Sequence, residues 1–166
     1  MFYPGMDTSS GPLMRKLLIG QLFQDPTNLP KYDSVRQLWE HSLPNRPPLL
    51  WGIVWLQGTV TEYFDEHSVV LDDGTGRIRI DCLKGAKNNP ISTPEVGEYI
   101  AVIGDLVCPT EQSAGQVSEW YIAAKLLVTL SERQSSEESS TQLADLNVAL
   151  FELSWPLEVM DMIHAL

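Results

Sequence analysis

The chain has 166 residues and a formal net charge of −11, with 22 acidic residues against 11 basic ones. Hydrophobic residues make up 43% of it and charged residues 20%, which is the composition of an ordinary globular protein. No apolar run approaches the ~20 residues that a membrane helix needs, and the N-terminus lacks the pattern of a signal peptide. Independent nucleic-acid binding is disfavoured, because such proteins usually present a basic surface to the phosphates.

The N-terminal part of the chain carries two helical patterns separated by prolines. Residues 1–12 are rich in Gly, Pro and Ser and are expected to form a flexible tail. Apolar positions within Leu13–Phe23 recur at helical spacing, and Pro26 ends that pattern. A second, weaker helical pattern covers Ser34–Glu40, before the proline-rich stretch Pro44–Pro48 breaks the chain again.

The centre of the chain has the alternating apolar pattern of β-strands. Five strands are predicted, at Ile53–Tyr63, Ser68–Asp72, Arg77–Leu83, Tyr99–Val107 and Trp120–Leu130. The Asp-Gly turn at Asp72–Gly76 joins the second strand to the third, since it supplies the positive φ of a hairpin. Five short strands in this order predict an antiparallel meander that closes into a barrel, with Gly58 and Gly104 at close approaches between strands.

The alternation also predicts which side chains face the barrel interior. On the third strand Ile78, Ile80 and Cys82 are expected to face inward, and Arg77, Arg79 and Asp81 outward. On the fifth strand Lys125 is expected on the face opposite Ile122, Ala124 and Leu126. Both cysteines, Cys82 and Cys108, are interpreted as buried, reduced thiols.

A change of composition separates the barrel from the C-terminal part. Residues 131–142 are Ser-rich and acidic without apolar periodicity, which predicts a mobile linker. Residues 143–166 regain helical spacing, with Ser154 as a helix N-cap and Pro156 in the first turn. Leu157, Met160 and Ile163 are then expected on one face of this final helix.

No residue pattern supports catalysis, a metal ion or another cofactor. His41, His67 and His164 are scattered and have no ligand at metal-binding spacing. The turn at Asp72 begins like a calcium loop but lacks the later ligands, and no Ser, Cys or Lys lies in a nucleophile motif. The sequence therefore predicts a protein that is not an enzyme.

Four segments in this order and spacing resemble a known family. They are Val54–Gly58, Leu71–Gly76, Gly97–Gly104 and Trp155–Asp161. They are similar to the OB-fold of the middle subunit of replication protein A, and more so to the RecQ-mediated genome instability protein 2 family. The resemblance covers residues 13–166 and implies a mainly β protein: a five-stranded OB-fold barrel with an N-terminal and a C-terminal helix. The segment that leads to the final helix is longer here than is usual in the family.

The resemblance also implies a function. Members of the family are non-catalytic nuclear subunits that pair with a second OB-fold protein, RecQ-mediated genome instability protein 1. The pair joins topoisomerase III alpha and a Bloom-type RecQ helicase in the dissolution of double Holliday junctions. In animals the pair also offers a groove to a peptide of the Fanconi anaemia M translocase.

Candidate partner-binding residues follow from this comparison, each with an ordinary structural alternative. Leu157, Met160 and Ile163 either pack on the chain's own barrel or meet a partner helix. Trp155 is a core anchor or, as the resemblance favours, an interface residue. Lys125 either extends its stem over apolar neighbours or lies at the subunit junction, and Trp55 covers the barrel end or contacts the partner.

The competing interpretation is a single-strand binding module like a replication protein A or telomere-cap subunit. A modest basic stripe of Arg77, Arg79, Lys84 and Lys87 could contact phosphates weakly. The loop Glu62–His67 offers two aromatic rings, but three acidic residues lie beside them and repel phosphate. Little or no direct DNA binding is therefore predicted.

Overall fold

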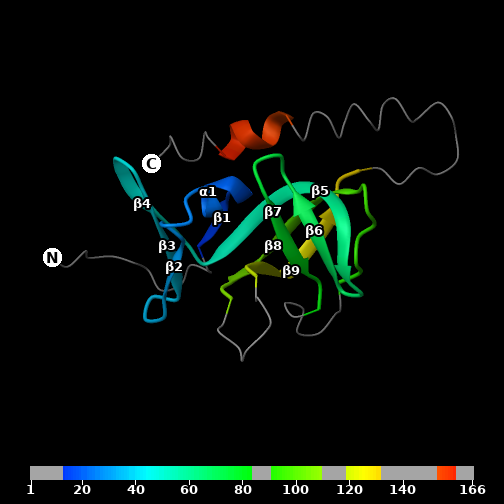
Figure 1. Cartoon of the computed structure of the whole chain (residues 1–166), viewed down its shortest axis with the longest axis horizontal. Helices are drawn as coiled ribbons and strands as arrows, with labels where there is room; N and C mark the ends of the chain where they lie inside the picture. The colour runs from blue at the N-terminus through cyan, green and yellow to red at the C-terminus, as the bar shows by residue number, and fades with distance from the viewer. Residues whose placement is uncertain (1–12, 84–90, 110–118, 132–152, 160–166) are drawn as a thin grey trace, which may run out of the picture.

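The structure, a computed structural model, describes residues 13–83, 91–109, 119–131 and 153–159. A β-barrel forms the body of the molecule, a small three-stranded sheet lies beside it, and a C-terminal helix over residues 153–159 lies on the outside (Figure 1). The tail predicted for residues 1–12 and nearly all of the linker predicted for residues 131–142 lie outside the described residues. In the part that is described, none of the helices has the length and apolar character to cross a membrane.

Five strands form the barrel: β5 (Ile53–Asp65), β6 (Ser68–Asp72), β7 (Arg77–Asp81), β8 (Tyr99–Val107) and β9 (Tyr121–Thr129). They follow one another around the ring as β5-β6-β7-β9-β8, and β8 pairs with β5 to close it. β7 and β9 run parallel. The predicted barrel is confirmed, but the predicted meander is wrong, because the chain crosses from β7 to β8 before β9 fills the space between them. A five-stranded barrel with this crossover is an OB-fold.

Side chains that alternate along the strands fill the barrel interior, among them Val54, Leu56, Val60, Val69, Leu71, Ile78, Ile80, Ile100, Val102, Leu106 and Ile122. The alternation predicted for β7 fails at its end. Asp81, expected to face outward, is buried, and its carboxylate accepts a hydrogen bond from the Leu83 amide at 3.0 Å. The strand ends there, so Asp81 and Cys82 are both buried as the chain turns.

Two glycines allow the strands to approach closely, as predicted. A Cβ on Gly58 would lie 2.5 Å from the carbonyl oxygen of Asp72, and one on Gly104 would lie 2.3 Å from that of Ala123. Real Cβ atoms do not approach backbone oxygens so closely, and neither backbone can move without breaking its sheet pairing. The two positions therefore require glycine for steric reasons.

The helix predicted over Leu13–Phe23 is mostly wrong. Residues Met14–Lys16 form strand β1, which pairs in parallel with β5, and only Ile19–Phe23 form the helix α1. The carbonyl of Leu13 accepts hydrogen bonds from the amides of Gly52 and Ile53 at 2.7 and 3.1 Å. The free edge of β5 thus supplies partners for backbone groups that a helix would have satisfied internally.

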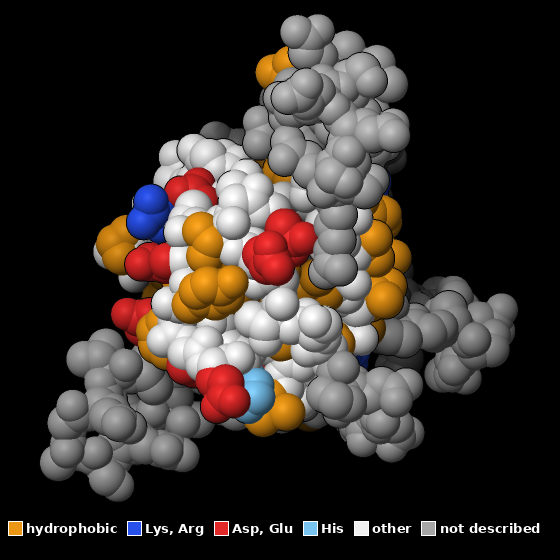
Figure 2. Space-filling model, turned by 90° about the vertical axis from the view of Figure 1, so that its right-hand side faces the viewer, with side chains coloured by type: hydrophobic (Ala, Val, Ile, Leu, Met, Phe, Trp, Pro, Cys, Tyr) orange, Lys and Arg blue, Asp and Glu red, His pale blue; other side chains and the backbone are white. Residues whose placement is uncertain are grey.

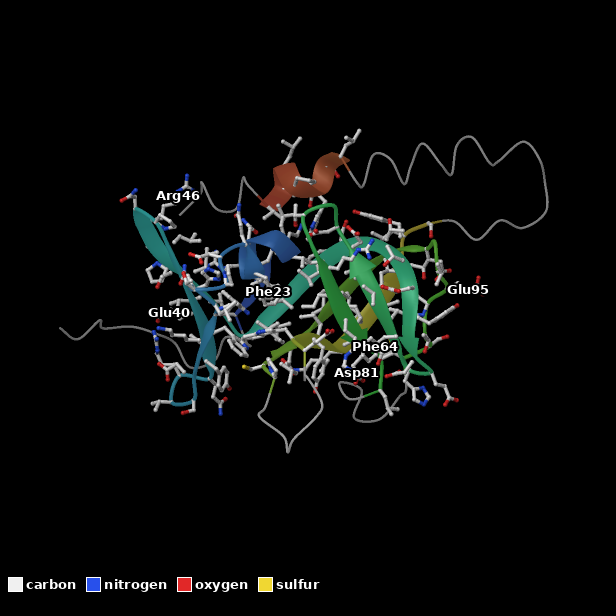
Figure 3. All side chains as sticks on the ribbon, viewed as in Figure 1. Phe23, Glu40, Arg46, Phe64, Asp81 and Glu95 are labelled. Atoms are coloured by element: carbon white, nitrogen blue, oxygen red, sulfur yellow. The ribbon has the colours of Figure 1, made fainter. Side chains whose placement is uncertain are left out.

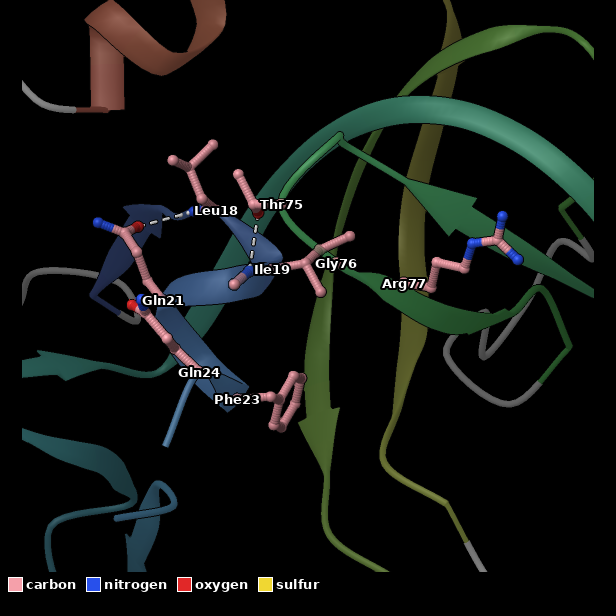
Figure 4. A pocket seen from close by; sticks show the side chains of 9 residues that line it. Leu18, Ile19, Gln21, Phe23, Gln24, Thr75, Gly76 and Arg77 are labelled. Carbon is pink, nitrogen blue, oxygen red and sulfur yellow. Dashed lines mark hydrogen bonds between the residues drawn. The ribbon is translucent and has the colours of Figure 1, made fainter. Parts of the chain in front are cut away.

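The hairpin between β6 and β7 holds α1 against the barrel (Figure 4). The carboxylate of Asp73 accepts a hydrogen bond from the Ile19 amide at 2.7 Å, and the Thr75 hydroxyl accepts one from the Gly20 amide at 2.8 Å. Amide groups in the first turn of a helix have no partner within the helix, so this turn acts as an external cap.

The helix predicted over Ser34–Glu40 is wrong. The region forms an antiparallel sheet of β2 (Lys31–Asp33), β3 (Leu38–Leu43) and β4 (Arg46–Trp51). The β2–β3 turn is closed by Asp33, whose carboxylate accepts hydrogen bonds from the amides of Val35 and Arg36 at 2.9 and 3.0 Å. Gln37 and Asn45 adopt positive φ angles of 55° and 59° in the two turns. Of the prolines expected to break the chain, Pro44 lies in the β3–β4 turn, and Pro47 and Pro48 lie on β4, at the edge of the sheet, where a missing N–H is tolerated.

Candidate partner-binding face

Four side chains meet on the outside of the barrel where β1 borders β5. Lys16 on β1 is the register partner of Trp55 on β5, and Trp155 of the C-terminal helix packs on Trp55 with ring centroids 6.0 Å apart. The Lys16 ammonium lies 4.3 Å from the Trp55 ring centroid and 5.4 Å from that of Trp155, and forms an ion pair with Glu158 at 2.7 Å. We call these four residues the indole corner.

The indole corner holds two buried donors without acceptors. The Nε1 atoms of Trp55 and Trp155 are both buried, and neither has a hydrogen-bond partner in the described part of the chain. Leaving a buried N–H unpaired costs roughly 1–3 kcal/mol. In this arrangement both nitrogen atoms are closed to an incoming ligand, and the Lys16 charge beside them is already paired with Glu158.

An apolar surface continues from the indole corner across β8 and β9. Trp55 pairs with Ile103, and Ile103 pairs with Leu126, so these side chains form one row on the outside of the barrel. The adjacent row contains Ala101 and Val128. Leu126 and Val128 are 52% and 46% exposed. We call these five residues the pairing face.

A β-bulge places Lys125 at the border of the pairing face. Ile103 pairs with Leu126 whereas Gly104 pairs with Ala124, so Lys125 is the extra residue of β9. The Lys125 ammonium lies 3.0 Å from the carboxylate of Asp105 on β8. The bulge shifts the alternation by one residue, which corrects the expectation that Leu126 faces inward with Ala124: Leu126 is exposed.

The C-terminal helix presents two different faces. Trp155 and Val159 are buried, at 2% and 0% exposure, whereas Leu153 and Leu157 are 71% and 64% exposed. The helix begins at residue 153, one residue before the predicted N-cap Ser154. Met160 and Ile163, predicted to continue the Leu157 face, lie outside the described residues.

The two described residues of the predicted basic stripe, Arg77 and Arg79, both contact other side chains of this chain. Arg77 lies 2.9 Å from the Asp72 carboxylate and 4.0 Å from that of Glu62. The Arg79 guanidinium lies between two rings, 4.7 Å from the Phe64 centroid and 4.4 Å from that of Tyr121. Lys84 and Lys87 lie outside the described residues. On one end of the barrel acidic side chains outnumber basic ones (Figure 2).

The two cysteines differ in environment. Cys82 is buried, and desolvation together with Asp81 and Asp65 raises its pKa to about 11. Cys108 is exposed at the end of β8, so the expectation of two buried thiols is correct only for Cys82. Among the described residues, no three His, Cys, Asp or Glu side chains gather as metal ligands.

The structure thus brings Trp55 and Trp155 together and places Lys125 on the same side of the barrel. Sequence reasoning missed Lys16, Glu158, Asp105 and Val128. A correct β1 assignment would have revealed Lys16, because the parallel register sets it beside Trp55. The exposure of Val128 depends on the bulge, for which the sequence carries no signal.

Comparisons with known proteins give one family match. The family model described as RecQ-mediated genome instability protein 2 matches residues 14–163. A search of curated proteins finds none that matches. Among solved structures, one chain of a replication protein A heterotrimer bound to ssDNA is similar, with 14% identity, a TM-score of 0.40, and coverage of 86% of this chain and 97% of that one. The hypothetical protein ygiW from E. coli is 19% identical with a TM-score of 0.33, over 46% of this chain and 73% of that one.

Proposed function

Because the chain belongs to the RecQ-mediated genome instability protein 2 family, we propose that it is a non-catalytic OB-fold scaffold subunit that pairs with a second OB-fold protein. The single observation that carries the pairing is the exposed apolar surface beside the C-terminal helix. Leu126 and Val128 on β9 and Leu157 on the helix are each about half exposed or more. Leu126 and Val128 lie two positions apart on the same face of β9, and exposed apolar side chains that gather in this way mark an interaction site rather than ordinary surface.

The proposed contact has two parts. The exposed Leu153 and Leu157 offer an i, i+4 stripe to a partner helix, in the helix-packing mode of recognition. The pairing face offers a flat apolar sheet surface next to it. Fully burying a Leu or Val side chain contributes roughly 1.5–3 kcal/mol, so covering both parts supplies several kcal/mol toward association.

The indole corner has a distinct part in this proposal. A peptide that displaced the Lys16–Glu158 ion pair would bring carbonyl or carboxylate oxygens to the two indole N–H groups, which are buried and unpaired in this structure. Lys125 lies on the same outer side of the barrel, one row beyond Leu126. We assign these groups to a second ligand, an acidic peptide segment that reaches the assembled pair.

The family supports a more specific proposal about the partners. The second OB-fold protein would be RecQ-mediated genome instability protein 1, and the pair would act with topoisomerase III alpha and a Bloom-type RecQ helicase on double Holliday junctions. The site of action would then be the nucleus, and the peptide at the indole corner would come from a Fanconi anaemia M translocase.

Co-expression of the full chain with the candidate OB-fold partner tests the pairing. The double substitution Leu126→Asp with Leu157→Asp places two charges on the proposed contact, and we expect it to abolish co-purification. Val35→Asp is the matched control, because Val35 is 92% exposed in the β2–β3 turn, away from this surface. Both side chains of the double variant are exposed, so its circular dichroism should match that of the unmodified chain. A double variant that co-purified as well as the control would refute the pairing proposal.

A further inference from the structure

The C-terminal helix is positioned on the barrel by side-chain contacts. Its Trp155 and Val159 are buried, and its Glu158 forms an ion pair with Lys16 of β1. Figure 3 shows that side chains of this helix point both toward the barrel and away from it. Residues 132–152 link the barrel to the helix along the chain, and a segment of that length can span about 70 Å when extended. The side-chain contacts, and not a short connection, therefore determine where the helix lies.

Lys16 supplies the positive charge at this junction. Its ammonium group lies 4.3 Å from the ring centroid of Trp55, 5.4 Å from that of Trp155 and 2.7 Å from the carboxylate of Glu158. One cation thus contacts a barrel strand and two residues of the helix. The Lys16 side chain is only 22% exposed, so water screens its contacts less than those of a fully exposed ion pair.

The charge of Lys16 matters because the C-terminal segment is acidic. Residues 153–166 include Glu158 and Asp161 but no Lys or Arg, and the whole chain has a net charge of −11. An acidic chain repels an acidic segment unless a cation lies between them. Apolar burial favours docking of the helix whatever the charges are, whereas the contacts of Lys16 make docking depend on charge.

Docking of the helix also has a cost at the same junction. The Nε1 atoms of Trp55 and Trp155 are buried without an acceptor in the described part of the chain. Both N–H groups would be open to water if the helix left the barrel, so their desolvation opposes the gain from apolar burial. The equilibrium between the docked and the released helix is therefore sensitive to the contacts that one cation makes.

The docked helix presents its exposed stripe in a fixed orientation. Leu153 and Leu157 are 71% and 64% exposed, on a side of the helix other than that of the buried Trp155. Trp55, on which Trp155 packs, also begins the row that continues to Ile103 on the pairing face. The exposed stripe is thus held beside the pairing face before a partner arrives, which reduces the conformational entropy that pairing costs.

We propose that Lys16 is a positioning residue for the pairing: its charge holds the C-terminal helix in the orientation that the partner recognises. This inference rests on the proposed function. Lys16 acts through Trp155 and Glu158 and not by contact with the partner. When its charge is lost, the docked fraction of the helix falls, and the apparent affinity for the partner falls in the same proportion. Loss of one charge at Nζ therefore weakens pairing while the pairing face itself stays unchanged.

The indole N–H groups of the full-length chain report the docking. Their NMR signals are assigned with Trp55→Phe and Trp155→Phe, and their exchange with water is measured in the unpaired chain. Lys16→Met keeps the apolar stem and removes the charge, so we expect exchange at both indoles to become about tenfold faster. Lys16→Arg supplies a cation that also stacks on indole rings and should keep the exchange slow. Lys31→Met, at an exposed lysine of β2, is the matched control and should change nothing.

Calorimetry then measures the affinity of the same variants for the OB-fold partner, purified RecQ-mediated genome instability protein 1. We expect Lys16→Met to weaken pairing in proportion to the docked fraction, and Lys16→Arg and Lys31→Met to bind as the unmodified chain does. Glu158→Gln removes the ion pair from the helix side and leaves β1 intact. It should shift exchange and affinity in the same direction as Lys16→Met, but by less, because the contacts of Lys16 with the rings remain.

Two results would overturn the inference by itself. One is indole exchange that stays slow in Lys16→Met, and the other is faster exchange without any loss of affinity. Failure of the proposed function has a different signature: the unmodified chain would show both indoles protected and yet bind no partner. That outcome would refute the pairing, and the positioning role of Lys16 with it.

Discussion

The indole rings of Trp55 and Trp155 pack at 6.0 Å between centroids and at an interplanar angle of 40°, which joins the first barrel strand to the last described helix. The ammonium group of Lys16, on the neighbouring strand, makes cation–π contacts with both rings. The helix therefore depends on a few side chains for its position on the barrel. Its attachment and its exposed Leu157 face are separable, because they use different sides of the helix.

Trp155→Ala should release the helix from the barrel. The substitution removes an almost fully buried indole and leaves Trp55 uncovered, so we expect a loss of about 3 kcal/mol in the free energy of unfolding. Urea denaturation followed by tryptophan fluorescence measures this loss. Leu157→Ala on the exposed face is the control and should change stability by no more than about 0.5 kcal/mol. Equal effects of the two substitutions would contradict the assigned orientation of the helix.

Gly104→Ala should prevent the barrel from closing properly. The new methyl group would lie 2.3 Å from the Ala123 carbonyl oxygen, at the β8–β9 pairing next to the bulge. Relief requires the two strands to separate, so we expect a loss of about 3 kcal/mol or more and poor recovery of soluble protein. Ala101→Ser adds one atom at an outward position of the same strand and should be tolerated. Thermal unfolding of both variants by circular dichroism distinguishes them.

Asp73→Ala should loosen α1 without unfolding the barrel. The carboxylate accepts hydrogen bonds from the amides of Ile19, Thr75 and Gly76 at 2.7, 2.9 and 3.2 Å, so its removal leaves both the turn and the helix start without an acceptor. Comparable cap removals cost about 1–2 kcal/mol. Hydrogen exchange at the Ile19 amide should accelerate, while amides in β8 retain their protection. Thr75→Ser, which keeps a hydroxyl group, should behave nearly as the unmodified chain.

His41 should make the fold sensitive to mild acid. It is buried on β3, and desolvation lowers its pKa below the ordinary value of 6.5, with partial opposition from Asp25. The unfolded chain then binds a proton more readily than the folded one, so stability is complete above about pH 6.5 and declines as the pH falls below it. The urea midpoint should drop between about pH 7.5 and about pH 5.5.

Two histidine substitutions identify the residue responsible. His41→Phe removes the titrating group and should flatten the pH dependence in this range, even if it changes stability at neutral pH. His67→Gln alters an exposed histidine and should leave the slope intact. A slope that persisted in His41→Phe would assign the pH dependence to another group.

Local pattern predicted the barrel because its strands obey a simple alternation. The β6–β7 hairpin follows from Asp-Gly chemistry, and Gly58 and Gly104 mark real close approaches of backbone. The family relationship also follows from the sequence, since short segments keep their order and spacing along nearly the whole chain. The sequence alone therefore determined the fold class and the family.

The tertiary structure decided the elements whose partners are distant in sequence. Met14–Lys16 and Leu38–Leu43 have apolar spacing that suits a helix locally, but the edge of β5 and the β2–β4 pairings offer backbone hydrogen bonds that local spacing does not reveal. The predicted strand order was wrong for the same reason, because β8 pairs with β5, a strand that is distant in sequence.

The sequence predicted only some residues of the candidate site. Trp155 and Trp55 were identifiable as large aromatic residues, but their contact, and the Lys16 charge beside them, exist only once β1 lies against β5. The exposure of Leu126 depends on one extra residue in β9, which reverses the facing of everything after it. Composition and alternation determine which residues can be buried, and register determines which of them remain available to a partner.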